Sequence, residues 1–221
     1  MKTLFNALML ALMMNATVPA NAVSTETFQE IAKHTVNVLS EDGTGTGTII
    51  DQHHVLTAFH VVPDKDGNYL CVLPDGYIVF AQVERSDPAS DLAMLVTLSP
   101  LGDDGATIAT QSPMKFQAVA TVGFPLGMEV PVATEGVFNA LLPENNILSV
   151  FTLSITFGNS GGGVYAIDKY GHPTLTGVVH AMSVSTYIGI DYPTFHLLLG
   201  ISYQPMVAFL KPKFEGFGLG G

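Results

Sequence analysis

Tryptophan is absent from this chain of 221 residues, and cysteine occurs once, as Cys71. A single cysteine excludes an intramolecular disulfide, so the fold must be held by packing of the apolar residues that make up 48% of the sequence. Cys71 lies in the apolar run YLCVLP. This setting favours a small buried side chain over a reactive nucleophile.

Positive charge is also scarce. The chain has 8 Lys and Arg against 19 Asp and Glu, which gives a net charge of −11, and no cluster of Lys or Arg stands out. Such a surface repels the phosphate groups of nucleic acids. The composition therefore excludes nucleic acid as a partner.

Long hydrophobic runs are missing beyond the first 22 residues, so we expect no stable membrane span in the mature protein. At the start of the chain Lys2 precedes the apolar run LFNALMLALMM, and the small-residue sequence ANA follows at 20–22. This order is typical of a secretory signal peptide cleaved after Ala22, which predicts a secreted or periplasmic protein. The alternative is a buried amphipathic N-terminal helix.

The remaining sequence consists of short β-rich runs separated by turn sequences such as PDKDG, PDG and DKYGHP. This pattern predicts an all-β fold of two six-stranded antiparallel β-barrels, with a short C-terminal helix from YQPMVAFLK. The ten runs predicted as strands are Thr35–Leu39, Gly47–Ile50, Tyr69–Leu73, Tyr77–Val83, Leu92–Thr97, Ala118–Val122, Val132–Phe138, Ile147–Leu153, Gly163–Ile167 and Thr174–Met182.

A turn-rich stretch near 99–113 divides the predicted strands into two sets of similar size. It therefore serves as the boundary between two barrels. The predicted segments are a signal peptide at 1–22, an N-terminal barrel at 23–108, a C-terminal barrel at 109–212 and a flexible tail at 213–221.

Glycine is concentrated in one loop, FGNSGGGVYAI, which contains Gly158–Gly163. A phosphate-binding P-loop would need Lys and Ser or Thr after its last glycine, and a dinucleotide-binding loop would need to open a helix. Val164 and Tyr165 instead begin a predicted strand. The remaining interpretation is a nucleophilic Ser160 on a tight turn, with the N–H groups of Gly158 and Ser160, on either side of Asn159, as oxyanion donors.

A serine nucleophile needs a base and an acid that orients the base. His60 follows an apolar run in VLTAFHVV, and Asp91 precedes an alternating apolar run in SDLAMLVT. A surface histidine and an aspartate that caps a turn are the simpler alternatives for these two residues. Asp87 is a competing acid, but Asp91 has the more specific context.

The order His60, Asp91, Ser160 and their contexts resemble the trypsin-like (chymotrypsin-fold) serine proteases, especially the HtrA/Deg-type branch. The similar segments are GTGTGTIIDQHHVLTAFHVV, SDLAMLVT, VGFPLGMEVPVATEGVFNA and GNSGGGVY. This resemblance implies an endopeptidase that hydrolyses polypeptides through an acyl-enzyme without metal or cofactor. The alternatives are a catalytically silent peptide-binding protein on the same fold and a viral-type polyprotein-processing protease.

Three departures from the family pattern matter. Too few residues follow Ser183 for a PDZ domain, Asn159 is neutral and cannot pair with a new N-terminus as in zymogen activation, and Gly163 lengthens the glycine row. The sequence assigns no oligomeric state. His53, His54 and the Asp103–Gly105 turn lack the spacing of metal ligands.

The resemblance also implies a first specificity pocket lined by 154–157 and 180–183, stretches that contain no acidic residue. A preference for Lys or Arg is therefore not expected. One hypothesis is that His180 and Thr156 recognise Glu or Gln, although the spacing from Gly177 to His180 departs by one residue from the family's Gly-x-His. A His180 that faces the core or the solvent is the simpler alternative. The rival pocket is one for small apolar residues beside Ala181, with Phe157 and Met182 as walls.

Overall fold

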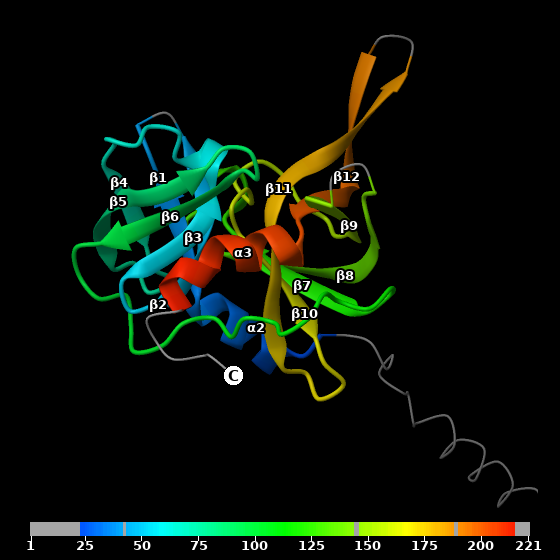
Figure 1. The fold of residues 1–221 in the computed structure, drawn as a ribbon, viewed down its shortest axis with the longest axis horizontal. Helices are drawn as coiled ribbons and strands as arrows, with labels where there is room; N and C mark the ends of the chain where they lie inside the picture. The colour runs from blue at the N-terminus through cyan, green and yellow to red at the C-terminus, as the bar shows by residue number, and fades with distance from the viewer. Residues whose placement is uncertain (1–22, 42, 144–145, 188–189, 215–221) are drawn as a thin grey trace, which may run out of the picture.

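The computed structural model describes residues 23–41, 43–143, 146–187 and 190–214, and two closed six-stranded antiparallel β-barrels form its body (Figure 1). The fold class predicted from the sequence is confirmed. The first barrel has the strand order β1-β2-β3-β6-β5-β4 and the second β10-β11-β12-β9-β8-β7. The predicted signal peptide lies outside the described residues.

The strands of the first barrel are β1 Thr35–Leu39, β2 Thr44–Asp51, β3 His54–Ala58, β4 Tyr69–Val72, β5 Ile78–Asp87 and β6 Leu92–Thr97. Those of the second are β7 Ala118–Gly123, β8 Val132–Leu141, β9 Leu148–Thr152, β10 Gly163–Ile167, β11 Pro173–Tyr187 and β12 Ile190–Ile201. Each of the ten predicted strands overlaps one of these. Two strands have no counterpart among the ten. Strand β3 was recognised only as the apolar run before His60, and β12 was not predicted because its sequence mixes polar residues with a Pro and lacks a clear alternation.

Two α-helices of the described part of the chain flank the barrels. Helix α3 Tyr203–Phe214 is the predicted C-terminal helix, and it extends into the segment predicted as a tail. Helix α2 Thr25–Lys33 was not predicted, although Ser24 caps it through a hydrogen bond from Thr27 N to Ser24 Oγ. No helix among the described residues is long and apolar enough to cross a bilayer.

Each helix joins parts of the chain that are distant in sequence. Helix α2 precedes the first barrel but packs on β7 and β11 of the second, where Thr27 Oγ1 donates to Gly171 O at 2.7 Å. Helix α3 follows the second barrel and places Phe209 under the Arg85 guanidinium of β5, 4.4 Å from the ring centre. The two helices therefore fasten the barrels together (Figure 1).

The apolar residues form a core inside each barrel and a third core between them. The core between the barrels joins side chains of both barrels and both helices, such as Leu56, Tyr165, Ile31 and Met206. Cys71 is fully buried in the first barrel, and this burial raises the pKa of its thiol to about 12. The thiol is therefore unreactive in the folded protein, as its apolar context predicts.

Candidate active site

Asp91 lies in the turn between β5 and β6, at the edge of the first barrel. Its backbone has a φ of 55°, in the left-handed region that Asp and Asn enter more readily than other non-glycine residues. Asp87, the competing acid, holds this turn by accepting bonds from Ala89 N at 3.1 Å and from Ser90 Oγ. The turn therefore uses one aspartate for its own structure and presents the other to His60.

His60 lies in the short 3-10 helix η1 Phe59–Val61, directly after β3. Its Nδ1 lies 2.8 Å from Asp91 Oδ2, and its backbone N–H donates to Asp91 Oδ1 at 3.0 Å. Phe59 N also donates to the Asp91 carbonyl at 3.0 Å. These bonds fix the position of the imidazole and orient its Nε2 away from the carboxylate.

The Asp91 carboxylate is ionised over a wide range of pH. Partial burial raises its pKa, but hydrogen bonds from His180 and His60 and the positive charge that His60 can carry oppose this and win. The net pKa of Asp91 lies well below the usual carboxylate range. A permanent negative charge beside His60 stabilises an imidazolium there.

Ser160 lies in the loop before β10, and a threonine of the first barrel holds this loop in place. Thr46 N donates to Ser160 O at 2.8 Å, and Thr46 Oγ1 donates to Gly158 O at 2.7 Å. The same hydroxyl accepts a bond from Phe124 N at 3.1 Å. Sequence reasoning did not identify Thr46, and the alternation of Gly and Thr in GTGTGT was the available signal.

The backbone N–H groups of Gly158 and Ser160 are the predicted oxyanion donors. Leu126 N donates to Phe157 O at 2.6 Å, so the N–H of Gly158, on the other side of that trans peptide, points away from Leu126. Within the described residues neither the Gly158 nor the Ser160 N–H donates a hydrogen bond. Both N–H groups are therefore available to bind an anion, and Asn159 lies between them in the chain, as the prediction had it.

Gly158 and Gly163 are glycines for different reasons. Gly158 has a φ of 92°, and a Cβ there would meet Phe124 O at 2.3 Å. A Cβ on Gly163 would meet side-chain atoms of Leu175, Thr48 and Tyr165 at 2.7–2.8 Å. The additional glycine of the row thus allows the barrels to approach closely at β2, β10 and β11.

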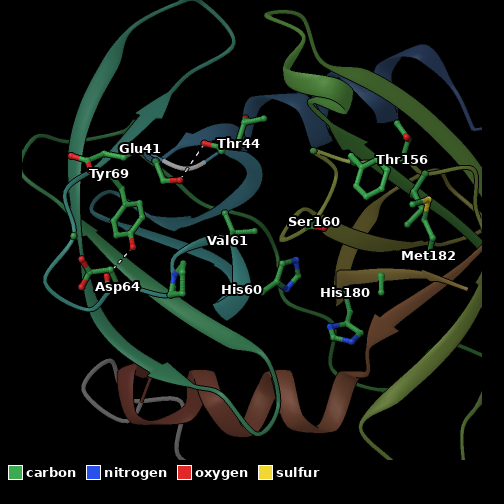
Figure 2. A pocket seen from close by; sticks show the side chains of 18 of the residues that line it. Glu41, Thr44, His60, Val61, Asp64, Tyr69, Thr156, Ser160, His180 and Met182 are labelled. Carbon is green, nitrogen blue, oxygen red and sulfur yellow. Dashed lines mark hydrogen bonds between the residues drawn. The ribbon is translucent and has the colours of Figure 1, made fainter. Parts of the chain in front are cut away.

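His60 and Ser160 line one cleft of about 790 Å³ between the barrels. Figure 2 shows both side chains in its centre, with Tyr69 and Asp64 on one side and Thr156 and Met182 on the other. The five residues predicted to contact substrate all line this cleft: Thr156, Phe157, His180, Ala181 and Met182. Ser160 Oγ has no hydrogen-bond partner among the described residues, as is common before substrate closes such a site.

His180 also lines the cleft, but its ring is oriented toward the acid. Its Nδ1 lies 2.6 Å from Asp91 Oδ2, so this nitrogen is not available to read a substrate side chain beside Thr156. One possible metal-ligand atom from each of His60, Asp91 and His180 lies within 4.8 Å of the others, close enough for a metal ion. Both imidazoles bond the carboxylate through Nδ1, so hydrogen bonds alone account for this arrangement.

A model of the trypsin-like peptidase domain matches residues 45–172, more than half of the chain. The chain belongs to the trypsin-like peptidase family. By family and fold this trypsin-like peptidase is a serine endopeptidase, and the predicted recognition is confirmed at that level. No curated protein matches its sequence.

Solved proteases share the fold of this trypsin-like peptidase. The inactive form of Rv3671c from M. tuberculosis, as a serine-to-alanine mutant, aligns with a TM-score of 0.68 and 21% identity over 90% of this chain and 95% of that one. The serine endoprotease from Yersinia pestis aligns with a TM-score of 0.67 and 23% identity over 87% of this chain and 67% of that one. At these identities the likeness concerns the fold alone.

Proposed function

We propose that this endopeptidase cleaves polypeptides through an acyl-enzyme on Ser160, with His60 as base and Asp91 as the acid that orients it. The bond from His60 Nδ1 to Asp91 Oδ2 at 2.8 Å, in the cleft that also contains Ser160, carries the proposal. A carboxylate accepts but does not donate, so this bond keeps the proton on Nδ1 and leaves Nε2 as the base.

The reaction takes place in two stages, in which groups of the chain first form and then hydrolyse the acyl-enzyme. Ser160 Oγ attacks the carbonyl carbon while its proton passes to His60 Nε2, and the carbonyl oxygen becomes an anion bound by the N–H groups of Gly158 and Ser160. His60 then gives the proton to the leaving amine as the C–N bond breaks. Water activated by His60 hydrolyses the ester and restores Ser160.

The substrate binds as an added strand along β11. Strand β10 pairs with β11 as far as Val178. In the loop before β10, Gly161 N donates to Val179 O, and Gly162 O accepts from Val179 N. From His180 onward this edge of β11 has no partner strand among the described residues. It therefore offers free backbone groups to an extended peptide beside the cleft.

The residue before the cut bond is apolar in this proposal. No acidic side chain accompanies Thr156, Phe157, Ala181 and Met182 in that part of the cleft, and His180 Nδ1 is bonded to Asp91. We expect a peptide library to give cleavage after small or medium apolar residues. A preference for Glu or Gln would contradict this assignment.

Labelling by a fluorophosphonate tests the nucleophile. We expect wild type to be labelled at Ser160, and Ser160→Ala to lose both label and peptide cleavage. Ser154, a more exposed serine in the same segment, is the matched control, and Ser154→Ala should still be labelled. Intact cleavage by Ser160→Ala would exclude the mechanism. A wild type that binds peptides but is neither labelled nor able to cleave them would support the silent peptide-binding alternative instead.

The location follows from the N-terminal segment. Its charge, apolar run and ANA sequence support export and cleavage after Ala22 to a secreted or periplasmic form. N-terminal sequencing of the exported chain should begin at Val23. A chain that keeps residues 1–22 and remains in the cytoplasm would contradict the proposal.

A further inference from the structure

His180 occupies an irregular position in β11. Val179 pairs with Gly200 of β12 and Ala181 pairs with Leu199, so His180 has no partner in the register and forms a β-bulge. A bulge redirects the side chain that it carries. Here it brings the His180 ring, with its side chain 32% exposed, across to the first barrel.

The two imidazoles share one oxygen atom. Asp91 Oδ2 lies 2.8 Å from His60 Nδ1 and 2.6 Å from His180 Nδ1. The ring centres are 6.0 Å apart and the planes meet at 79°, so the rings do not stack (Figure 2). Each ring contacts the Asp91 carboxylate through its Nδ1 edge. Since a carboxylate only accepts, each Nδ1 carries its proton, and neither Nε2 has a hydrogen-bond partner among the described residues.

We propose that His180 is a positioning residue of the catalytic site, which holds the Asp91 carboxylate against His60 and couples the charge of that pair to its own protonation. The proposal rests on the peptidase function proposed above. The bond from His180 restrains the carboxylate, whose side chain is only 16% exposed, in the orientation that His60 requires.

The coupling follows from the charge that a second imidazole can carry. When His180 takes a proton on Nε2 it becomes a cation in contact with Asp91. The imidazolium that forms on His60 in the transition state then shares its counter-ion with a like charge. Full activity therefore requires a neutral His180.

Other titratable groups around β11 are engaged elsewhere or do not reach His180. In the described residues His54 of β3 bonds Asp51, Lys33 of α2 bonds Glu30, and His196 of β12 bonds Ser154. Among the side chains that the structure describes, the further titratable ones on the elements packed on β11 form no hydrogen bond or ion pair with His180: Glu26, Tyr165, Tyr203 and Lys211.

Two substitutions separate the positioning bond from the charge. His180→Ala removes both, and we expect kcat to fall about 10- to 100-fold with little change in KM, as for one hydrogen bond to a charged group lost in the transition state. His180→Asn keeps an amide N–H near the place of Nδ1–H but cannot become a cation. It should recover most of the loss near neutral pH.

The coupling is read by an NMR titration of the histidine Cε1–H signals. In wild type the His60 signal should show two inflections, its own and that of His180, whereas in His180→Asn it should show one. His172, which pairs with Asp168 at 3.2 Å on a remote turn, is the matched control and should titrate identically in both proteins. In a plot of log kcat/KM against pH, the acid limb should have a slope above 1 for wild type and a slope of 1 for His180→Asn.

The outcomes are distinguishable. A kcat for folded His180→Ala within about twofold of wild type, or a His60 titration that is the same in wild type and His180→Asn, would overturn the proposal. Should His180→Ala fail to fold, the comparison of wild type with His180→Asn still decides. Failure of the peptidase function itself would appear as absent fluorophosphonate labelling of wild type, which the NMR titration does not depend on.

Discussion

At the scale of single residues, Asp91 organises the site. Its two carboxylate oxygens accept from His60 N, His60 Nδ1 and His180 Nδ1, and its carbonyl accepts from Phe59 N. A residue with these contacts and a left-handed backbone tolerates few replacements. Asn is the natural test, because it enters the same backbone region and changes only the charge and one acceptor.

We expect Asp91→Asn to lower kcat by about 10⁴-fold, because an amide neither stabilises the imidazolium nor favours the correct tautomer of His60. The measurement is steady-state cleavage of a peptide substrate by folded protein. Asp87→Asn is the matched control, since Asp87 bonds its own turn and not His60. Retention of a tenth of the activity or more in Asp91→Asn would contradict the role of Asp91.

The same carboxylate predicts a dependence of stability on pH. Its pKa in the folded protein lies below the value of about 3.9 expected in the unfolded chain, so ionised Asp91 stabilises the fold above that pH. The contribution is lost as pH falls below about 4 toward the folded pKa. Urea unfolding should therefore show that the difference in stability between wild type and Asp91→Asn becomes smaller as the pH falls. A difference that stays constant would argue against this contribution of the Asp91 charge.

Gly158 is the residue that most directly sets the proposed oxyanion hole. Gly158→Ala would force the backbone away from Phe124 O and displace the N–H that binds the anion. We expect kcat to fall about 10²- to 10³-fold, the usual loss for one such donor. Gly43→Ala, whose methyl would meet no atom within 4 Å, is the control for thermal stability and should leave Tm unchanged.

At the scale of elements, the loop before β10 that contains Ser160 depends on a strand of the other barrel. Thr46 of β2 is fully buried and bonds both the Gly158 carbonyl and Phe124 N through one hydroxyl. Further bonds from Gly161 N to Val179 O and from Val179 N to Gly162 O attach the loop to β11. The loop is therefore held from both barrels at once.

Replacement of Thr46 by Val keeps the shape and removes the hydroxyl. Two buried backbone groups lose their partner, so we expect a loss of stability of about 1–3 kcal/mol and a lower kcat. Thr46→Ser retains the hydroxyl and should restore kcat. Denaturant unfolding and peptide cleavage measure the two effects, and a Val variant as active and stable as the Ser variant would contradict this role.

At the scale of the whole molecule, the N-terminal segment binds the second barrel before the first barrel begins. Val23 N lies 2.7 Å from Glu135 Oε2 of β8, and α2 follows on the same barrel. Cleavage after Ala22, which we propose, would turn Val23 N into a charged amino group. The bond to Glu135 would then become an exposed ion pair.

We expect Glu135→Gln to lower the Tm of the mature chain by about 1–3 °C, as for an exposed ion pair. The control is the mature chain with an acetylated N-terminus, in which the substitution should have less effect because the amino group has no charge. Equal effects in both chains would show that the charge of Val23 does not contribute.

The sequence determined the two barrels and the three residues of the proposed mechanism. Alternating apolar runs and turn residues depend on local chemistry, and the motifs around His60, Asp91 and Ser160 are each contained in a few consecutive residues. Helix α2 was missed despite its Ser24 cap, because its apolar positions are few and its stability comes from packing on the second barrel.

Only the tertiary structure decided the contacts between barrels. His180 was one hypothesis for the specificity pocket and does line the cleft, but its contact with Asp91 was not predicted. A bulge that no local pattern reveals brings its Nδ1 to Asp91, which is 89 positions earlier in the chain. Thr46 likewise acts on a loop 112 positions later. Such pairings depend on strand phase and on how two closed barrels meet, and these are properties of the packed molecule and not of any single segment.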